Sequence, residues 1–321
     1  MTLTLSRAMA GFIHYKIAAG KSPYTIRNYR TTFAKLQNYL GTDPPLAAIE
    51  RSQLIDFFAW LQEEYVSKPG GIATGQSVKL GAKTILNIHA DLSSLWHWAV
   101  DEDFVEINIV RTIESPNAKS PPVDPFTQKD IEALLGVCER KASHRAGDER
   151  HAAIAERNHL IILLLVDTGL RAQELCDITR DDMDMSANKI RVRGKGDKER
   201  VVYFGKRTAK ALWRYITPRL SDGECRLFTV GPADDPRPLT RLVLRQTLLR
   251  IGQRAGVANV YPHRFRHTFA ITYLRNGGDL FTLQDLLGHS DLAMVRRYAR
   301  IAQADCARAH QKASPVDNWR L

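Results

Sequence analysis

A run of apolar residues at positions 160–166 is the feature that most constrains how this 321-residue chain can fold. The run reads Leu-Ile-Ile-Leu-Leu-Leu-Val, and such a uniformly apolar segment belongs in a protein core. It is far too short to cross a lipid bilayer, so it must be buried against other parts of the chain. Arg171 follows in the sequence Thr168-Gly169-Leu170-Arg171. We therefore expect a permanently charged side chain at the mouth of a buried element.

Arg171 has two interpretations at that place. Its planar guanidinium can donate two parallel hydrogen bonds to the oxygens of a phosphate group. Alternatively, it forms an internal ion pair with Glu174, which lies three residues further on and on the same helical face. This stretch by itself favours neither interpretation.

Composition indicates a soluble globular protein, with 44% hydrophobic and 25% charged residues and enough length for two domains. The first residues lack the long apolar core of a signal peptide. The four cysteines have no paired spacing, which argues against a zinc cluster and against a disulfide framework: Cys138, Cys176, Cys225 and Cys306. We therefore expect a cytoplasmic location.

The formal net charge of +11 arises almost entirely after residue 112. A basic excess confined to one part of a chain favours a polyanionic partner, most commonly nucleic acid. The charge alone is a weak indication, because many basic proteins have no such partner.

Apolar residues recur with helical spacing along residues 1–112. This pattern predicts helices over residues 5–19, 23–40, 52–65 and 83–100. Gly20 and Gly41 act as stop signals, and Ser22-Pro23 supplies a capping hydroxyl and a proline at the first helical position. Residues 1–112 are predicted to form a small helical bundle.

Several basic side chains of the bundle could contact a DNA backbone, although solvated surface charge is the commoner explanation for such residues. The candidates in this part of the chain are Lys21, Arg27, Arg30, Lys79, Lys83 and His89. Two further candidates lie later in the chain, at Lys198 and Arg264.

Residues 113–126 contain four prolines and no periodicity, which predicts a semi-rigid linker. Thr127 and Asp130 then form a capping box that begins a second domain over residues 127–321. Alternating residues predict a β-hairpin from strands 189–193 and 200–204 with a basic, glycine-containing tip. Further helices are predicted over residues 207–217, 239–255, 262–276, 280–287 and 291–310.

The stretch 261–267 reads Tyr-Pro-His-Arg-Phe-Arg-His and begins a helix at its proline. His263 and Arg266 share one face at the helix N-terminus, where backbone donors and the helix dipole favour an anion. His263 and His267 have the spacing of metal ligands. No Glu follows the first histidine, and Arg264 and Arg266 crowd the site, so no metal is predicted.

His289 and Tyr298 would each be interpreted as structural residues if they stood alone. Together with the preceding stretches, however, they complete five motifs that resemble the tyrosine recombinase (phage integrase) family in order and spacing. The motifs are Thr168-Gly-Leu-Arg171-Ala-Gln-Glu-Leu175, Gly194-Lys195-Gly196, His263-Arg-Phe-Arg266-His-Thr-Phe-Ala270, Leu286-Leu-Gly-His289-Ser290 and Tyr298. The resemblance spans residues 127–310, and residues 5–110 resemble the family's helical core-binding domain.

The resemblance implies a role for each motif residue. Tyr298 would attack the scissile phosphodiester and form a 3′-phosphotyrosyl bond, which conserves the bond energy without metal, ATP or another cofactor. Arg171, Arg266 and His289 would stabilise the charge of the transition state. Lys195 would protonate the leaving 5′ oxygen, His263 would act as general base toward Tyr298, and Glu174 would orient its neighbours.

We therefore expect a mainly α-helical protein with a small β-sheet, whose two domains close as a clamp around duplex DNA. It would recombine two sites of inverted-repeat sequence as a tetramer, with or without a partner recombinase, either to integrate and excise a mobile element or to resolve DNA multimers. The alternatives are a nicking-closing enzyme like a type IB topoisomerase and a non-catalytic DNA-binding relative. The sequence does not specify the target DNA.

A large aromatic residue, Trp319, lies in a polar stretch two residues before the end of the sequence. A tryptophan in a desolvated pocket is a common interface anchor. We therefore predict that residues 301–319 dock on a neighbouring protomer and couple assembly to catalysis. The alternative is a frayed terminus.

Overall fold

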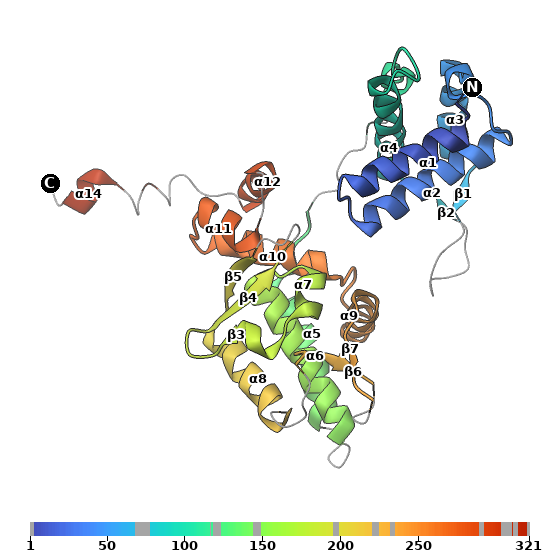
Figure 1. Ribbon diagram of the computed structural model, residues 1–321. Helices are drawn as coiled ribbons and strands as arrows, with labels where there is room; N and C mark the ends of the chain where they lie inside the picture. The colour runs from blue at the N-terminus through green and yellow to red at the C-terminus, as the bar shows by residue number, and fades with distance from the viewer. Residues whose placement is uncertain are drawn as a thin grey trace. The chain divides into compact units, whose positions relative to one another are not determined.

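The computed structural model (Figure 1) divides into two compact units, Met1–Pro121 and Pro122–Leu321, each with a hydrophobic core of its own. The structure describes residues 3–67, 78–115, 117, 123–143, 149–194, 199–219, 225–231, 235–288, 292–302, 310 and 314–319. In these parts of the chain, no helix combines the length and apolar character needed to span a membrane.

The first unit is built from four α-helices, as the apolar spacing predicts. Its elements are α1 (Leu5–Ala18), α2 (Pro23–Leu40), η1 (Leu46–Ala48), α3 (Arg51–Glu63), β1 (Val66–Ser67), β2 (Val78–Lys79), α4 (Ala82–Asp101) and η2 (Ile109–Thr112). The Ser22 hydroxyl accepts a hydrogen bond from the Thr25 backbone N–H at 3.2 Å, and Gly41 ends α2 with φ of 66°. Both predicted helix boundaries are therefore confirmed.

The core of the first unit centres on Phe12 of α1. Its ring meets Tyr29 and Phe33 of α2 at centroid distances of 5.0 and 5.8 Å, and Trp98 of α4 at 5.9 Å. These edge-on contacts are favourable because the positive edge of one ring faces the negative face of another. Three helices are thereby packed around one aromatic side chain.

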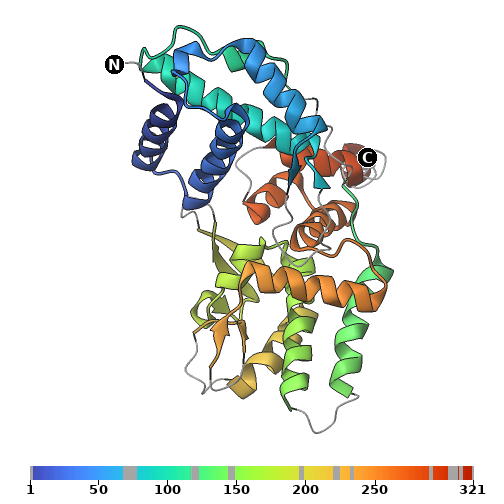
Figure 2. The same ribbon diagram turned by 90° about the vertical axis from the view of Figure 1, so that its right-hand side faces the viewer.

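The second unit is also mainly helical, with short antiparallel sheets (Figure 2). Its helices are α5 (Gln128–Ser143), α6 (Glu149–Thr168), α7 (Ala172–Asp177), η3 (Arg180–Asp182), α8 (Lys206–Ile216), η4 (Thr217–Arg219), α9 (Arg241–Ala255), α10 (Pro262–Arg275), α11 (Leu280–Leu287), α12 (Leu292–Ala302) and α14 (Pro315–Trp319). Its strands are β3 (Met183–Asp184), β4 (Lys189–Arg193), β5 (Glu199–Tyr203), β6 (Thr229–Val230) and β7 (Arg237–Pro238). The predicted fold class is confirmed.

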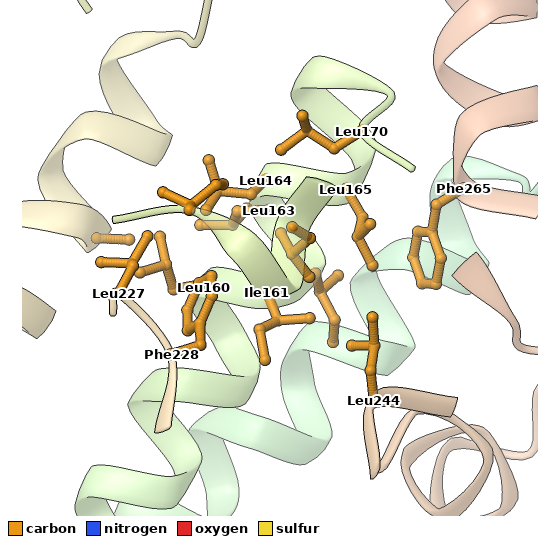
Figure 3. Close-up of a cluster of buried hydrophobic side chains, with 14 of the residues drawn as sticks. Leu160, Ile161, Leu163, Leu164, Leu165, Leu170, Leu227, Phe228, Leu244 and Phe265 are labelled. Atoms are coloured by element: carbon orange, nitrogen blue, oxygen red, sulfur yellow. The ribbon is translucent and has the colours of Figure 1, made fainter. Parts of the chain in front are cut away.

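Helix α6 is the centre of this unit. Residues 160–165 are each at most 8% exposed, so the apolar run is core, as predicted. In Figure 3 these side chains lie between Leu227 and Phe228 on one side and Leu244 and Phe265 on the other. The C-terminal end of α6, which leads to Arg171, is consequently fixed by packing.

The predicted hairpin forms the larger sheet, in the order β3-β4-β5 with antiparallel pairing. Ile190, Val192 and Val202 face the core, and the residues between them are more exposed. The second strand begins one residue earlier than predicted, and β3 was not predicted because its two residues are too few to show a periodicity. The hairpin tip, residues 195–198, lies outside the described residues.

The chain enters the second unit along α10. The Phe126 backbone N–H donates to the Thr268 hydroxyl at 2.9 Å, and the Arg264 guanidinium donates to the backbone and side-chain oxygens of Asp124 at 2.9 and 2.7 Å. Thr127 and Asp130 form the predicted capping box, with reciprocal bonds of 2.9 and 3.2 Å. The last residues of the predicted linker are therefore attached to the second unit.

Candidate active site

Arg171 follows a sharp turn at the end of α6. The Thr168 hydroxyl donates back to the Leu164 carbonyl at 2.5 Å, and Gly169 adopts a left-handed conformation with φ of 63°. A Cβ atom at position 169 would lie 2.4 Å from the Phe269 ring, so both the conformation and the close approach require glycine. This turn places Arg171 immediately before α7.

The internal ion pair of Arg171 with Glu174 is present. The Arg171 guanidinium donates to Glu174 Oε1 at 2.8 Å, and its backbone N–H donates to Oε2 at 2.7 Å. A further guanidinium nitrogen donates to the Gly288 carbonyl at 3.0 Å. The Arg171 side chain remains 36% exposed, so the ion pair orients it without closing it to a ligand.

Arg200 is a member of this cluster that the sequence interpretation missed. It donates two hydrogen bonds to the Glu174 carboxylate, at 2.7 and 2.8 Å, and one to the Leu286 carbonyl at 2.8 Å. Arg200 pairs with Val192 across the sheet, and directly opposed residues point to the same face. A cation on the core face of a predicted strand is the signal that could have identified it.

Glu174 is buried between the two guanidinium groups, with 5% of its surface exposed. Burial alone would raise the pKa of its carboxyl group. The hydrogen bonds and charge of Arg200, together with the bonds from Arg171, outweigh burial and lower the pKa to about 2. The carboxylate is therefore charged at neutral pH and fixes both arginines.

Arg266 on α10 is 1% exposed. Its guanidinium donates to the Gly169 carbonyl at 2.8 Å and to the Leu287 carbonyl at 2.5 Å. These carbonyls lie at the C-terminal ends of α6 and α11, where the helix dipole favours a cation. Burial, followed by the charge of Arg171, lowers the pKa of Arg266 to about 9, so it remains charged at neutral pH.

Two histidines of α10 lie beside Arg266. The rings of His263 and His267 meet edge to face, with centroids 4.3 Å apart. Burial of the ring, followed by the charges of Arg266 and Arg171, lowers the pKa of His263. The pKa of His267 is lowered to about 4, chiefly because its ring is partly buried. Electrostatic interactions with His263, Arg297 and Arg266 lower it further. Both imidazoles are neutral at physiological pH.

Tyr298 on α12 is completely buried against α10 and α11. Its Oη atom lies 2.8 Å from His267 Nδ1, and burial raises the pKa of its phenol. The positive charges of Arg266, Arg297 and Arg171 act in the opposite direction on that pKa but do not outweigh burial. Tyr298 lies in one buried cluster with Leu287, whose carbonyl accepts a hydrogen bond from Arg266. Tyr298 is therefore a neutral phenol in the same part of the site as Arg266.

The structure thus brings together Arg171, Glu174, His263, Arg266 and Tyr298. Lys195, Lys198 and His289 lie outside the described residues. Within the described part of the chain, no group of three or more His, Cys, Asp or Glu residues could bind a metal ion.

The other candidate DNA-binding residues divide into two sets. The first set is exposed: Lys21, Arg27, Arg30, Lys79 and Lys83. In the second set, His89 is 9% exposed and its Nε2 lies 3.1 Å from the Ile113 carbonyl. Arg264 is 8% exposed, bonds Asp124 and the Ala258 carbonyl, and lies 4.1 Å from the centroid of the Phe126 ring. These two side chains stabilise the protein itself, in contrast to the expected surface role.

Comparison with known families identifies the class of protein. Residues 125–305 match the phage integrase family, and residues 9–115 match the phage integrase SAM-like domain. The chain belongs to the phage integrase family. More particularly, it is a tyrosine site-specific recombinase, a DNA-binding enzyme of DNA recombination, and the topoisomerase-like and non-catalytic alternatives are not favoured.

Two curated relatives illustrate the similarity. The chain is 27% identical over 305 residues to tyrosine recombinase XerC of Staphylococcus saprophyticus, covering 94% of each protein. It is 30% identical over 280 residues to tyrosine recombinase XerD of Pseudomonas putida, covering 83% of this chain and 89% of that protein.

Solved structures share the fold at lower identity. The Tn1549 transposon integrase in complex with transposon right end DNA superposes with a TM-score of 0.73 at 20% identity, covering 97% of this chain and 99% of that one. The XerH site-specific recombinase bound to palindromic difH substrate gives a TM-score of 0.67 at 21% identity, covering 94% and 82%.

Proposed function

We propose that this recombinase cleaves and rejoins duplex DNA with Tyr298 as the nucleophile. The observation that carries the proposal is geometric: the buried Tyr298 bonds the residue next to Arg266 and packs in one cluster with Leu287. Arg266 donates to the Leu287 carbonyl, and Arg171 donates to the adjacent Gly288 carbonyl. Attack by Oη on the scissile phosphorus forms the phosphotyrosyl bond, the bond to the 5′ oxygen breaks, and the phenol proton passes to His263 as general base. A 5′ hydroxyl oxygen then attacks the same phosphorus, the bond to Tyr298 Oη breaks, and the DNA strand is rejoined.

Arg171 and Arg266 stabilise the additional negative charge of the five-coordinate transition state. Both guanidinium groups are already oriented by carbonyl oxygens and by Glu174, so little reorganisation is required when the phosphate arrives. In water such groups would have to be ordered during the reaction itself. The exposed third of the Arg171 side chain gives the phosphate a point of entry.

The remaining roles follow from proton transfer. Lys195 protonates the leaving 5′ oxygen, and His289 donates a further hydrogen bond to the phosphate. His263 acts as a proton acceptor near the arginine pair, because its lowered pKa keeps it neutral at physiological pH. Glu174 acts on Arg171 and not on DNA.

We further propose that residues 1–112 form a core-binding domain that contacts DNA and residues 127–321 form the catalytic domain, connected by residues 113–126. The exposed basic residues Lys21, Arg27, Arg30, Lys79 and Lys83 support DNA contacts by the first domain. Recombination takes place in the cytoplasm between two inverted-repeat sites in a tetramer, with or without a partner recombinase. It serves a mobile element or the resolution of DNA multimers.

The proposal is tested with Tyr298→Phe on a nicked DNA substrate that traps the covalent intermediate. We expect no covalent protein–DNA complex on a denaturing gel and nearly intact DNA binding, because the variant lacks only the nucleophilic oxygen. Tyr203→Phe, which changes an exposed phenol on β5, is the matched control and should cleave normally. A covalent complex formed by Tyr298→Phe would contradict the proposal.

A further inference from the structure

The hydroxyl group of Tyr298 is bound by a residue to which neither the sequence motifs nor the proposed mechanism assign a task. His267 Nδ1 lies 2.8 Å from Tyr298 Oη, which is within the ordinary range for an O–H···N hydrogen bond. The two rings are 5.5 Å apart between centroids and inclined by 58°. The residues are 31 positions apart in the sequence and lie on different helices, α10 and α12.

The same short segment of α10 also carries Arg266. The Arg266 guanidinium is bonded to the carbonyls of Gly169 and Leu287, and the adjacent residue, His267, reaches Tyr298. Arg266 is 1% exposed, and two backbone carbonyls hold its guanidinium in place. The hydrogen bond of His267 therefore links the Tyr298 hydroxyl to the helical segment that holds Arg266.

The direction of this hydrogen bond depends on the protonation states of the two groups and on the tautomer of His267. Burial raises the pKa of Tyr298, so the phenol keeps its proton at neutral pH. Dehydration and neighbouring positive groups lower the pKa of His267 to about 4, so its imidazole is neutral. A neutral imidazole with its proton on Nε2 offers a lone pair at Nδ1. The phenol O–H then donates, and His267 accepts.

We propose that His267 is a further positioning residue of this site: its Nδ1 accepts the hydrogen bond of the Tyr298 hydroxyl and fixes the nucleophilic oxygen next to Arg266. The inference rests on the proposed function, because it concerns the nucleophile named there. It assigns the task of orienting the phenol to His267 and leaves the task of general base with His263. Without His267 the buried hydroxyl would lose this acceptor and the orientation that it imposes.

The contact is tested directly in the full-length protein by nuclear magnetic resonance of ¹⁵N-labelled histidine. We expect the Nδ1 signal of His267 to have the shift of a hydrogen-bonded, unprotonated nitrogen, and to move downfield in Tyr298→Phe. His267→Asn identifies the signal by its disappearance. An unchanged His267 signal in Tyr298→Phe would overturn the inference, whatever the activity of the protein, because this measurement does not depend on cleavage.

The consequence for the reaction is tested by single-turnover cleavage of the trapping substrate. His267→Leu removes the acceptor, and we expect cleavage to slow between about 10-fold and about 100-fold with DNA affinity unchanged, because a misplaced nucleophile loses that much rate. His267→Asn keeps a polar atom near the place of Nδ1 and should recover most of the lost rate. His97→Asn, at an exposed histidine of α4, is the control.

Two results would contradict the proposal while leaving the proposed function intact. One is cleavage by His267→Leu at the wild-type rate. The other is an equal loss of cleavage rate in His267→Leu and His267→Asn, which would indicate that His267 has a steric role only. Failure of the proposed function has a different signature, namely covalent complex formation by Tyr298→Phe. The two ideas can therefore fail separately.

Discussion

The Glu174 carboxylate is charged, although very little of it reaches water. Its charge is stable because Arg200 and Arg171 surround it with hydrogen bonds. Removing one member of such a buried group is costly. The remaining charged groups are still shielded from water, but they have lost the partner whose opposite charge compensated for that. Glu174 therefore contributes both to the stability of the second unit and to the orientation of Arg171.

We predict that Glu174→Gln lowers the free energy of unfolding by about 3 kcal/mol at pH 7, the value of a pKa depressed from 4.5 to about 2. A depressed pKa stabilises the folded state above the unfolded-state pKa. The difference in the free energy of unfolding between the variant and the wild-type protein should therefore narrow as the pH falls from 4.5 toward 2. Urea unfolding followed by circular dichroism measures it.

Glu199→Gln is the control for that experiment. Glu199 bonds Arg193 at 3.2 Å on the surface, where both side chains are about half exposed or more. Exposed ion pairs contribute little, so we expect a change below about 1 kcal/mol at any pH. Equal effects of the two substitutions would show that burial of Glu174 does not matter.

A second prediction concerns the protonation of the leaving group by Lys195. Lys195→Ala should cleave an ordinary trapping substrate slowly and recover on a substrate whose 5′ oxygen is replaced by sulfur, because a thiolate leaves without a proton. Single-turnover rates on the two substrates provide the measurement. If sulfur gave no recovery, another group would supply the proton.

The residues of the site were predicted from the sequence with unequal success. Arg171 and Glu174 lie three residues apart, and their ion pair could be predicted from helical geometry. Arg200 and His267 were missed because their partners lie 26 and 31 positions away, and only the packing of separate elements brings them together. Local spacing carries no information about contacts of that kind.

The turn between α6 and α7 connects the core to both arginines. Gly169 provides the left-handed residue that ends α6, and its carbonyl accepts from Arg266. A helix packed as tightly as α6 cannot shift to relieve an error in this turn. The position of Arg266 therefore depends on a residue that has no functional group.

We predict that Gly169→Ala destabilises the protein well beyond the cost of the left-handed conformation and slows cleavage. The added methyl group would overlap the Phe269 ring, and relieving the overlap would move the carbonyl that binds Arg266. Gly256→Ala is the matched control, because Gly256 has φ of 68° with nothing near its Cβ position. Gly256→Ala should lower the free energy of unfolding by about 1 kcal/mol, measured by urea unfolding.

Helices could be predicted more reliably than the contacts between them. The boundaries of α2 follow from Ser22 and Gly41, and those of α11 from Asp279 and Gly288, because capping depends on neighbours in the sequence. Short elements such as η3 and β3 were not predicted. Their few residues show no periodicity, and tertiary contacts stabilise them.

The last described element of the chain is α14, where Trp319 is 72% exposed and Val316 is 57% exposed. Two exposed apolar side chains on a short terminal helix are consistent with the predicted docking of residues 301–319 on a neighbouring protomer. Residues 303–309 and 311–313 lie outside the described residues. The docking stays a prediction.

Deletion of residues 312–321 should leave binding to a single DNA site unchanged while weakening cooperative assembly and recombination on two sites. The physical reason is that the deletion removes the Trp319 anchor but none of the residues proposed to contact DNA or to react. Gel-shift titration on one-site and two-site DNA provides the measurement. Undiminished cooperativity with normal recombination would show that the segment is a frayed end.

The attachment of Asp124 and Phe126 to α10 has a mechanical consequence. Arg264 and Thr268 hold this incoming segment from positions on either side of Arg266. Tension in the chain ahead of Asp124 would therefore act directly on the helix that carries Arg266, His263 and His267, and through the buried Phe126 on the core around α6. The segment that connects the two units is thus anchored on α10, the helix that carries these three residues.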